Sequence, residues 1–159
     1  MSTQGNSMSG DRYYEWRYVV GFKDTNVVGN VYFVRHLEWQ GMCREMFIRD
    51  HAPEILDELE KGLCFVTLQT ACDYQGEINA FDQIAVRMRL EKRRRNRVWM
   101  TFEYVRIEKD GSETRVALGK QTVGCMRRTS KGMLPEAFPA GFMNALEPYS
   151  CVRVEDAEG

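Results

Sequence analysis

The stretch that decides the fold covers residues 31–51 and reads VYFVRHLEWQGMCREMFIRDH. Four of its positions recur at spacings of four, three and four residues, the period of one helix face: Leu37, Gly41, Arg44 and Ile48. The proline at position 53 predicts the end of this helix, because the residue before a proline is pushed out of helical dihedrals. A helix of about 18 residues is roughly 27 Å long. We expect its sheet-facing side to consist of Val34, Leu37, Gly41 and Ile48, with Gly41 allowing a close approach of the backbones.

Most of the remaining chain is patterned as strands. A strand candidate rich in Tyr, Trp and Val precedes the helix at residues 13–22, and Asp110-Gly111 marks a tight turn between two later strands. After Gly62 the expected strands cover residues 64–74, 83–92, 98–109 and 114–128. A strand, a long helix and then a run of antiparallel strands predict an α+β chain. The hotdog architecture, a long central helix wrapped by a curved antiparallel sheet of about five strands, satisfies these patterns.

Length and composition predict a single domain. The chain has 159 residues, of which 43% are hydrophobic and 28% are charged, and this is the size and composition of one compact core. Both ends are rich in small, polar or charged residues, which is typical of frayed termini. We therefore expect a disordered N-terminal tail at residues 1–11, a hotdog domain at 12–147 and a flexible C-terminal tail at 148–159.

Charge and patterning argue against several kinds of partner. The formal net charge of −1 is unlike the clear positive excess of a general nucleic-acid binder. No apolar run approaches about 18 residues, so we expect no membrane span. The polar start at residues 1–10 lacks the apolar core of a signal peptide, which predicts a cytoplasmic protein. The five cysteines form no CxxC pair, which argues against a disulfide framework and against a structural metal site.

Residues 21–47, GFKDTNVVGNVYFVRHLEWQGMCREMF, resemble the signature of the 4-hydroxybenzoyl-CoA thioesterase branch of the hotdog superfamily. That signature runs D-x-D-x-x-G-x-V-[YF] before the helix, and Asn26 stands at the position of the family's catalytic aspartate. Residues 30–47 are similar to one subfamily, the hotdog thioesterases encoded beside iterative polyketide synthases that make enediyne cores. The segment WQGxCRE at residues 39–45 is the specific part of this similarity.

The resemblance implies a set of catalytic residues. In the subfamily an asparagine, a tyrosine and an arginine replace the acidic machinery, and these positions fall on Asn26, His36 and Arg44. The backbone N–H of Phe33 corresponds to an oxyanion donor of the wider family. Without the resemblance, Asn26 is a turn former, His36 a hydrogen-bonded structural histidine and Arg44 a surface residue. Arg44 shares the predicted sheet-facing stripe, however, and a charge on a packing face needs a reason.

The spacing of two of these residues restricts how they work together. His36 and Arg44 are about 80° apart around the helix and about 12 Å apart along it, so they cannot meet over one small carbonyl. Either the substrate chain runs along the helix between them, or a neighbouring subunit contributes one of them. The carboxylates nearby, Glu38 and Glu45, are expected at the helix surface. In an alternative interpretation, Glu45 is the catalytic base of a less specialised enzyme.

The most concentrated charge in the chain is expected at a strand-to-strand turn, between residues 92 and 97. One interpretation is a solubilising hairpin tip. The other is a docking patch for a phosphopantetheine arm or an acidic carrier protein. Its basic residues are Lys92, Arg93, Arg94, Arg95 and Arg97.

Together, the residues and the resemblance imply an acyl carrier protein thioesterase. Its substrate would be a long conjugated β-keto polyene made by an iterative enediyne polyketide synthase, released by oxyanion stabilisation without a catalytic carboxylate. The acyl chain would arrive on phosphopantetheine, so no cofactor is expected. The implied partners are the carrier protein domain and further copies of the chain, as a dimer or a dimer of dimers. The alternatives are a general acyl-CoA thioesterase and a non-catalytic hotdog protein that binds an acyl chain.

Overall fold

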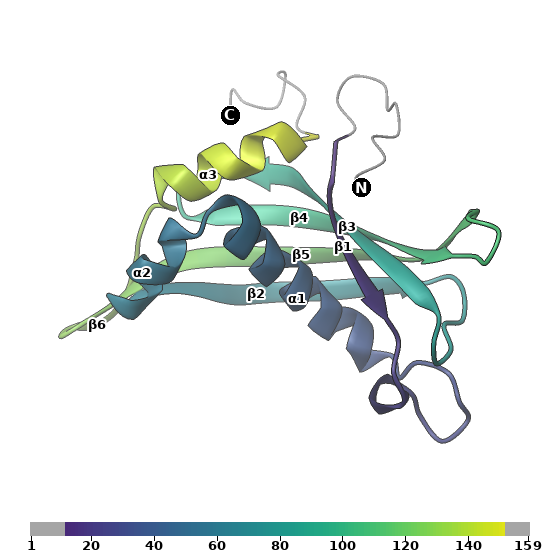
Figure 1. Ribbon diagram of the computed structural model, residues 1–159. Helices are drawn as coiled ribbons and strands as arrows, with labels where there is room; N and C mark the ends of the chain where they lie inside the picture. Colours follow the sequence, from purple (N-terminus) through teal and green to yellow (C-terminus); the bar gives the residue numbers. More distant parts are fainter. Residues whose placement is uncertain (1–11, 152–159) are drawn as a thin grey trace.

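The computed structural model describes residues 12–151, which form an antiparallel sheet and three α-helices (Figure 1). The strands are β1 (Tyr14–Val19), β2 (Leu63–Tyr74), β3 (Gln83–Arg93), β4 (Arg97–Ile107), β5 (Glu113–Thr129) and β6 (Gly132–Pro135). The helices are α1 (Val34–His51), α2 (Glu54–Glu60) and α3 (Ala140–Leu146), with 3₁₀ turns η1 (Phe22–Asp24) and η2 (Glu147–Tyr149). Within this described range the strand order is β1-β3-β4-β5-β2, and β6 pairs with the end of β5.

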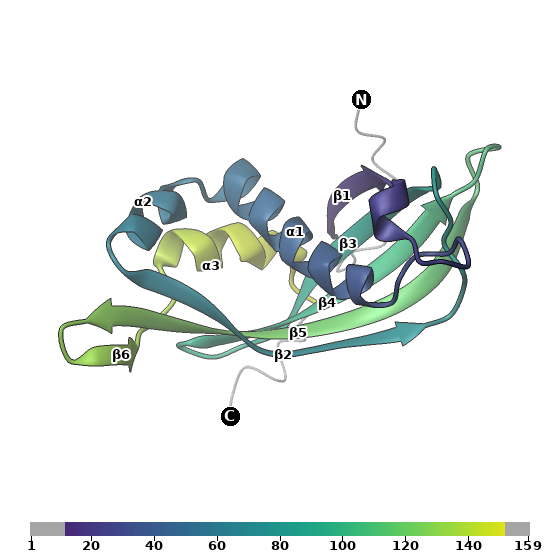
Figure 2. The same cartoon turned by 90° about the horizontal axis from the view of Figure 1, so that it is seen from below.

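Helix α1 lies across one face of the curved sheet, as Figures 1 and 2 show from two directions. Alternate side chains of β4 point toward this helix and are buried, from Val98 through Met100 and Phe102 to Tyr104. Register shifts interrupt the β2–β5, β3–β4 and β4–β5 pairings, and such bulges increase the local twist and bend of a strand. The hotdog fold expected from the sequence is therefore confirmed.

The strands expected after Gly62 are found within two residues of their predicted ends. Buried and partly exposed residues alternate along β4, because one face of this strand packs against α1 and the other does not. Strand β6 was not expected. It forms because β5 reverses direction after Thr129, where the hydroxyl of Thr129 donates to the carbonyl of Gly132 at 2.9 Å.

The structure corrects two expectations about α1. The helix begins at Val34 and not at residue 31, because the N–H groups of residues 31 and 32 donate to carbonyls of Ile78 and Asp24. Its buried face is also rotated from the predicted one, and Gly41 faces open space, where an added Cβ would meet nothing within 4 Å. The aromatic side chains of the observed face bury more apolar area than a stripe through Leu37 and Gly41. The buried residues are His36, Trp39, Gln40, Cys43, Phe47 and Ile48.

Ordered contacts with the sheet extend past the expected domain boundary at residue 147. That boundary falls inside η2, Ser150 forms a β-bridge with Leu90, and the N–H of Cys151 donates to the Leu90 carbonyl at 2.9 Å. The expected tail at residues 1–11 lies outside the described residues, as do residues 152–159 of the second tail. Among the described helices none is long and apolar enough to cross a membrane.

The second half of α1 packs into an aromatic cluster. Phe47 is fully buried and its ring lies 5.4 Å from that of Tyr14 and 6.1 Å from that of Phe142, measured between centroids. We expect Phe47→Ala to lower the free energy of unfolding by about 3–5 kcal/mol, because a buried ring is replaced by a cavity. Urea denaturation at fixed protein concentration measures this loss. Met42→Ala, at an exposed position of the same helix, is the control and should cost far less; equal losses would contradict this account of the core.

Candidate active site

Asp24 precedes the loop between η1 and α1, residues 25–33, and its backbone carbonyl accepts the Tyr32 N–H of that loop at 2.9 Å, whereas its buried carboxylate bonds to residues before the loop. Its Oδ2 accepts hydrogen bonds from the Tyr18 hydroxyl at 2.7 Å and from the Gly21 N–H at 2.9 Å. A β-bridge between Thr25 and Val31 closes the loop. Asp24 therefore holds the loop in place and is not presented to a ligand.

Asn26 lies in a tight turn within this loop and is half-buried. Its Oδ1 accepts the Val28 N–H at 3.0 Å, its own N–H donates to the Asn30 carbonyl at 2.9 Å, and its carbonyl accepts the Gly29 N–H at 3.0 Å. Gly29 has a φ of +93°, a conformation that glycine adopts without strain. Because the side-chain oxygen is used in the turn, the group that Asn26 can present to a ligand is its NH₂ donor.

The loop delivers Phe33 to the start of α1. The Phe33 carbonyl accepts a hydrogen bond from the Tyr74 hydroxyl of β2 at 2.7 Å, which ties the helix start to the sheet. The N–H groups at the start of an α-helix have no acceptor within the helix, and the positive end of the helix dipole points toward them. The backbone N–H of Phe33 thus lies where negative charge is stabilised.

His36 lies in the first turn of α1 and is 4% exposed. The rings of Trp39, Tyr74 and Tyr104 surround it at centroid distances of 4.8–5.4 Å. Neither ring nitrogen has a hydrogen-bond partner within residues 12–151. Burial lowers the pKa of His36 from 6.5 to about 4, so the imidazole is neutral at pH 7 and offers one donor and one acceptor.

Arg44 lies two helical turns beyond His36. Its Nη1 donates to Oε1 of Gln121 on β5 at 2.9 Å, and Gln121 is itself 4% exposed. Burial lowers the pKa of the Arg44 guanidinium, which nevertheless stays charged at neutral pH. In the described part of the chain no carboxylate forms an ion pair with Arg44. A desolvated cation whose partner is a neutral amide is suited to stabilise negative charge on a ligand.

Sequence reasoning missed the polar side chains that surround this arginine. Gln40 is fully buried, its Nε2 donates to the Ala71 carbonyl at 2.9 Å, and its Oε1 accepts the Thr70 hydroxyl at 2.7 Å. An added Cβ at Gly119 would collide with the amide nitrogen of Gln40, so glycine at this position leaves room for the side chain. The sequence did contain a signal for Gln121, because this glutamine interrupts a row of small and apolar residues at alternate positions of β5.

The predicted catalytic residues fall into two groups. Asn26, Phe33 and His36 lie around the start of α1, whereas Arg44 is eleven residues beyond Phe33, about 16 Å along the helix axis. Within one chain the two groups do not meet at a single carbonyl. The two arrangements expected from the sequence, a substrate along the helix or a second subunit, therefore both stay open.

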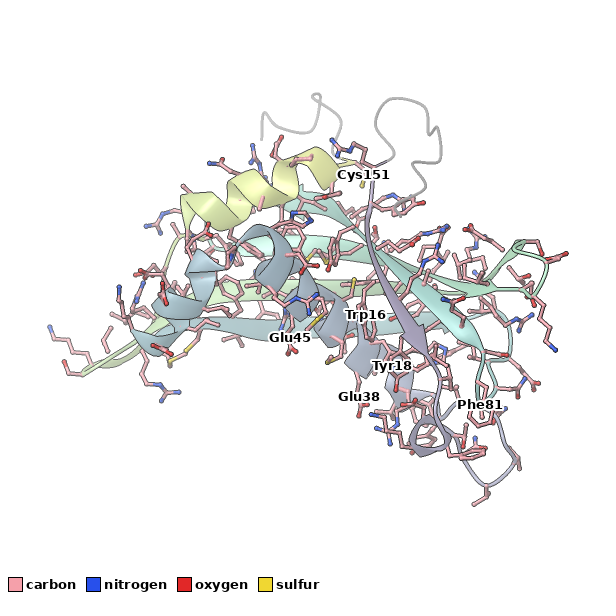
Figure 3. All side chains as sticks on the ribbon, viewed as in Figure 1. Trp16, Tyr18, Glu38, Glu45, Phe81 and Cys151 are labelled. Atoms are coloured by element: carbon pink, nitrogen blue, oxygen red, sulfur yellow. The ribbon has the colours of Figure 1, made fainter. Side chains whose placement is uncertain are left out.

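The nearby helix carboxylates lie at the surface. Glu38 and Glu45, labelled in Figure 3, are both exposed, and Glu38 forms an ion pair with Arg35 at 2.8 Å. This placement agrees with the surface role expected for them. Within residues 12–151 no cluster of three histidine, cysteine or acidic side chains could hold a metal ion.

The basic run lies at the β3–β4 hairpin, at the opposite end of the molecule from the loop at residues 25–33 (Figure 1). Lys92 and Arg97 flank the ring of Trp99, with Nζ and Cζ at 5.0 and 5.9 Å from its centroid. Arg93 forms an ion pair with Glu147 at 2.9 Å. The structure thus divides the run, and the exposed cations at the hairpin tip are Arg94 and Arg95.

Comparison with known proteins places these features in context. A family model described as the thioesterase-like superfamily matches residues 20–146. The solved structure of dynemicin thioesterase, an enzyme studied crystallographically for induced-fit and allosteric effects upon polyene binding, is 45% identical in sequence. The match covers 89% of this chain and 100% of that chain, with a TM-score of 0.85. None of the curated proteins compared with the chain matches it.

More distant structures share the fold. A 1,4-dihydroxy-2-naphthoyl-CoA thioesterase from Synechocystis is 14% identical, with 85% of this chain and 96% of that chain covered and a TM-score of 0.72. A 4-hydroxybenzoyl-CoA thioesterase from Pseudomonas sp. strain CBS-3 is also 14% identical, with 84% and 99% covered and a TM-score of 0.72. At this identity the likeness concerns the fold alone.

The buried neutral His36 predicts a pH dependence of stability. Between the folded-state pKa of about 4 and the ordinary value of 6.5, the unfolded chain binds a proton that the folded chain does not. His36 therefore makes its full contribution to the free energy of unfolding above about pH 6.5. This contribution, on the order of 3 kcal/mol, is lost as the pH falls toward 4. We expect His36→Phe to flatten this slope in urea denaturation curves recorded between pH 4.5 and 7. His51→Phe, which leaves His36 in place, should retain the slope, and an unchanged slope in His36→Phe would refute the assignment.

Proposed function

Because this chain belongs to the thioesterase-like superfamily and is a thioesterase of the hotdog fold, we propose that it releases a long conjugated β-keto polyene from an acyl carrier protein. The carrier would be a domain of an iterative enediyne polyketide synthase. Support comes from the 45% identity with dynemicin thioesterase, an enzyme whose crystal structures concern polyene binding. Further support comes from the segment at residues 39–45, which resembles thioesterases of this subfamily.

The observation that carries the proposed mechanism is the environment of Arg44. Its guanidinium is partly desolvated and hydrogen-bonded to the neutral amide of Gln121; Glu45 interacts with it electrostatically, but no carboxylate within residues 12–151 forms an ion pair with it. An enzyme that stabilises an oxyanion needs such a charge already in place before the reaction. With Asn26 at the family's aspartate position, this cation and neutral donors take the place of a carboxylate.

In the proposed reaction water attacks the thioester carbonyl. A C–O bond forms, the C–S bond breaks, and the phosphopantetheine thiolate takes up the proton that water loses. Negative charge builds on the carbonyl oxygen, where Arg44, the Asn26 amide and the Phe33 N–H can donate hydrogen bonds. Neutral His36 adds one donor and one acceptor at the same helix start. Thioesters are activated acyl donors, so this electrostatic assistance is sufficient without an acidic nucleophile.

A second copy of the chain completes the site in this proposal. Strand β2 lies at one end of the strand order, and its residues 67–71 are exposed. An uncovered edge strand of twelve residues is a surface for association. A dimer, or a dimer of dimers, would unite the group at the start of α1 in one copy with Arg44 of another. This arrangement resolves the separation of the two groups within one chain.

The β3–β4 hairpin is the proposed docking point for the acidic carrier protein. All five cations of the run are exposed; Arg94 and Arg95 lie at the tip, whereas the other three also contact Trp99 or Glu147. Exposed charges of one sign steer an oppositely charged partner and act mainly on association. A soluble acyl-CoA thioesterase would gain little from a cation pair so far from the start of α1.

Removal of the Arg44 charge tests the mechanism. We expect Arg44→Ala to lower kcat by about 10²–10³-fold, the cost of losing one oxyanion donor, in an assay of thiol release from a β-keto acyl carrier protein. Arg49→Ala is the matched control, since the Arg49 side chain is 65% exposed on the same helix. Wild-type turnover by Arg44→Ala would remove Arg44 from the mechanism. Product that never exceeds the protein concentration, even for the wild type, would favour the non-catalytic acyl-binding protein.

Charge reversal at the hairpin tests the carrier. We expect the double variant Arg94→Glu/Arg95→Glu to raise KM severalfold for the carrier-bound substrate and to leave kcat and the KM for the CoA thioester unchanged. The effect should shrink at high ionic strength, because these charges are exposed. Lys109→Glu/Arg115→Glu, with both cations exposed elsewhere, is the control. Equal activity on CoA and carrier substrates, unaffected by reversal, would instead favour a general acyl-CoA thioesterase.

A further inference from the structure

Gln121 occupies an unusual position in the inner row of β5, the row that faces α1. Alternate residues of a strand share a face, and this row also contains Ala117, Gly119, Val123 and Cys125, all buried. Gln121 is the polar member of this row. Its backbone is paired with Thr70 of β2 on one side and Met100 of β4 on the other, so the side chain projects from the middle of the sheet.

An amide is an unusual partner for a desolvated guanidinium. A carboxylate would bind Arg44 more strongly, and the chain uses carboxylates for an arginine that is buried more deeply: Arg87, 7% exposed, contacts Glu15 and Glu113 at 2.8 and 2.6 Å. At Arg44 the partner at 2.9 Å is the neutral Oε1 of Gln121. A neutral acceptor fixes the direction of the guanidinium and leaves its net charge intact.

We propose that Gln121 is a positioning residue for Arg44, which aims the guanidinium at the substrate oxygen without neutralising it. This inference rests on the proposed function of Arg44. Gln121 acts through the arginine, and the choice of an amide over a carboxylate at position 121 is what keeps the site active.

The neighbouring hydrogen bonds hold α1 and the sheet in place around the hydrogen bond between Arg44 and Gln121. The Thr70 hydroxyl, beside Gln121 in the sheet, donates to the side chain of Gln40, and Gln40 also donates to the Ala71 carbonyl. One turn of α1 separates Gln40 from Arg44, so the helix is fixed to β2 immediately next to the Arg44–Gln121 bond. With the helix and the strand both fixed, the Nη1–Oε1 contact sets the orientation of the guanidinium plane.

The decisive variant is Gln121→Glu, which keeps the size of the side chain and changes only its charge. We expect kcat for a β-keto acyl thioester to fall at least tenfold, while the urea midpoint stays at or above that of the wild type, because an ion pair replaces the hydrogen bond. If the glutamine were purely structural, kcat would stay at the wild-type value, whatever the change in the urea midpoint. Gln75→Glu is the matched control, since Gln75 also accepts from an arginine, Arg115 at 3.2 Å, at an exposed site. Its kcat should equal the wild-type value.

A second variant and a double-mutant cycle complete the test. Gln121→Met removes the acceptor and leaves the charge, so its kcat should fall below the wild-type value, though by less than that of Gln121→Glu. If Gln121→Glu does not fold, a wild-type kcat in Gln121→Met alone would overturn the inference. Adding Gln121→Glu to Arg44→Ala should change kcat no further, because the glutamine acts only through the arginine. Additive losses, or wild-type kcat in both single variants at 121, would overturn the inference. Loss in Arg44→Ala without loss at 121 would leave the proposed role of Arg44 standing, whereas full activity of Arg44→Ala would remove Arg44 from the mechanism and end this inference with it.

Discussion

The positive charge of Arg44 inside the fold sets the requirement that its surroundings meet. Taking a guanidinium out of water is costly unless protein groups replace the lost hydrogen bonds. Gln121 supplies one such group from the middle of the sheet, Gln40 ties α1 to β2, and Gly119 leaves the space that Gln40 fills. The apolar stripe of α1, packed beside these residues, fixes the rotation at which Arg44 points inward.

The groups around Arg44 and around the start of α1 share a chemical character. At the helix start, the Asp24 carboxylate is engaged with the Tyr18 hydroxyl and the Gly21 N–H, Asn26 presents an NH₂ donor, and His36 is neutral. In the other group, the Arg44 guanidinium donates a hydrogen bond to the amide of Gln121. Donors that are already oriented stabilise a developing oxyanion without a proton transfer of their own. Such donors suit a thioester, because its carbonyl is already reactive and needs polarisation more than it needs a strong nucleophile.

Much of the fold and the family could be predicted from short-range patterns. Alternation of apolar residues located β3 and β4, and the Asp110-Gly111 turn located the start of β5. The segment at residues 39–45 identified the enediyne-pathway thioesterases, and the 45% identity with dynemicin thioesterase confirms that recognition. The predicted start and the predicted buried face of α1 were wrong. The loop takes up residues 31–33, and successive residues are only about 100° apart around a helix, so the true buried face lies close to the predicted one.

By itself the sequence determined the α+β class, the hotdog fold and the thioesterase family, because these depend on periodicity and on contiguous motifs. The tertiary structure decided which face of α1 is buried, that the ring of His36 lies among aromatic rings, and that the amide of Gln121 is the partner of Arg44. Gln121 lies 77 residues from Arg44 in the chain, and the packing of α1 on β5 brings them together. A hydrogen bond at such a separation leaves no periodic trace, so only the packing of α1 on β5 could reveal it.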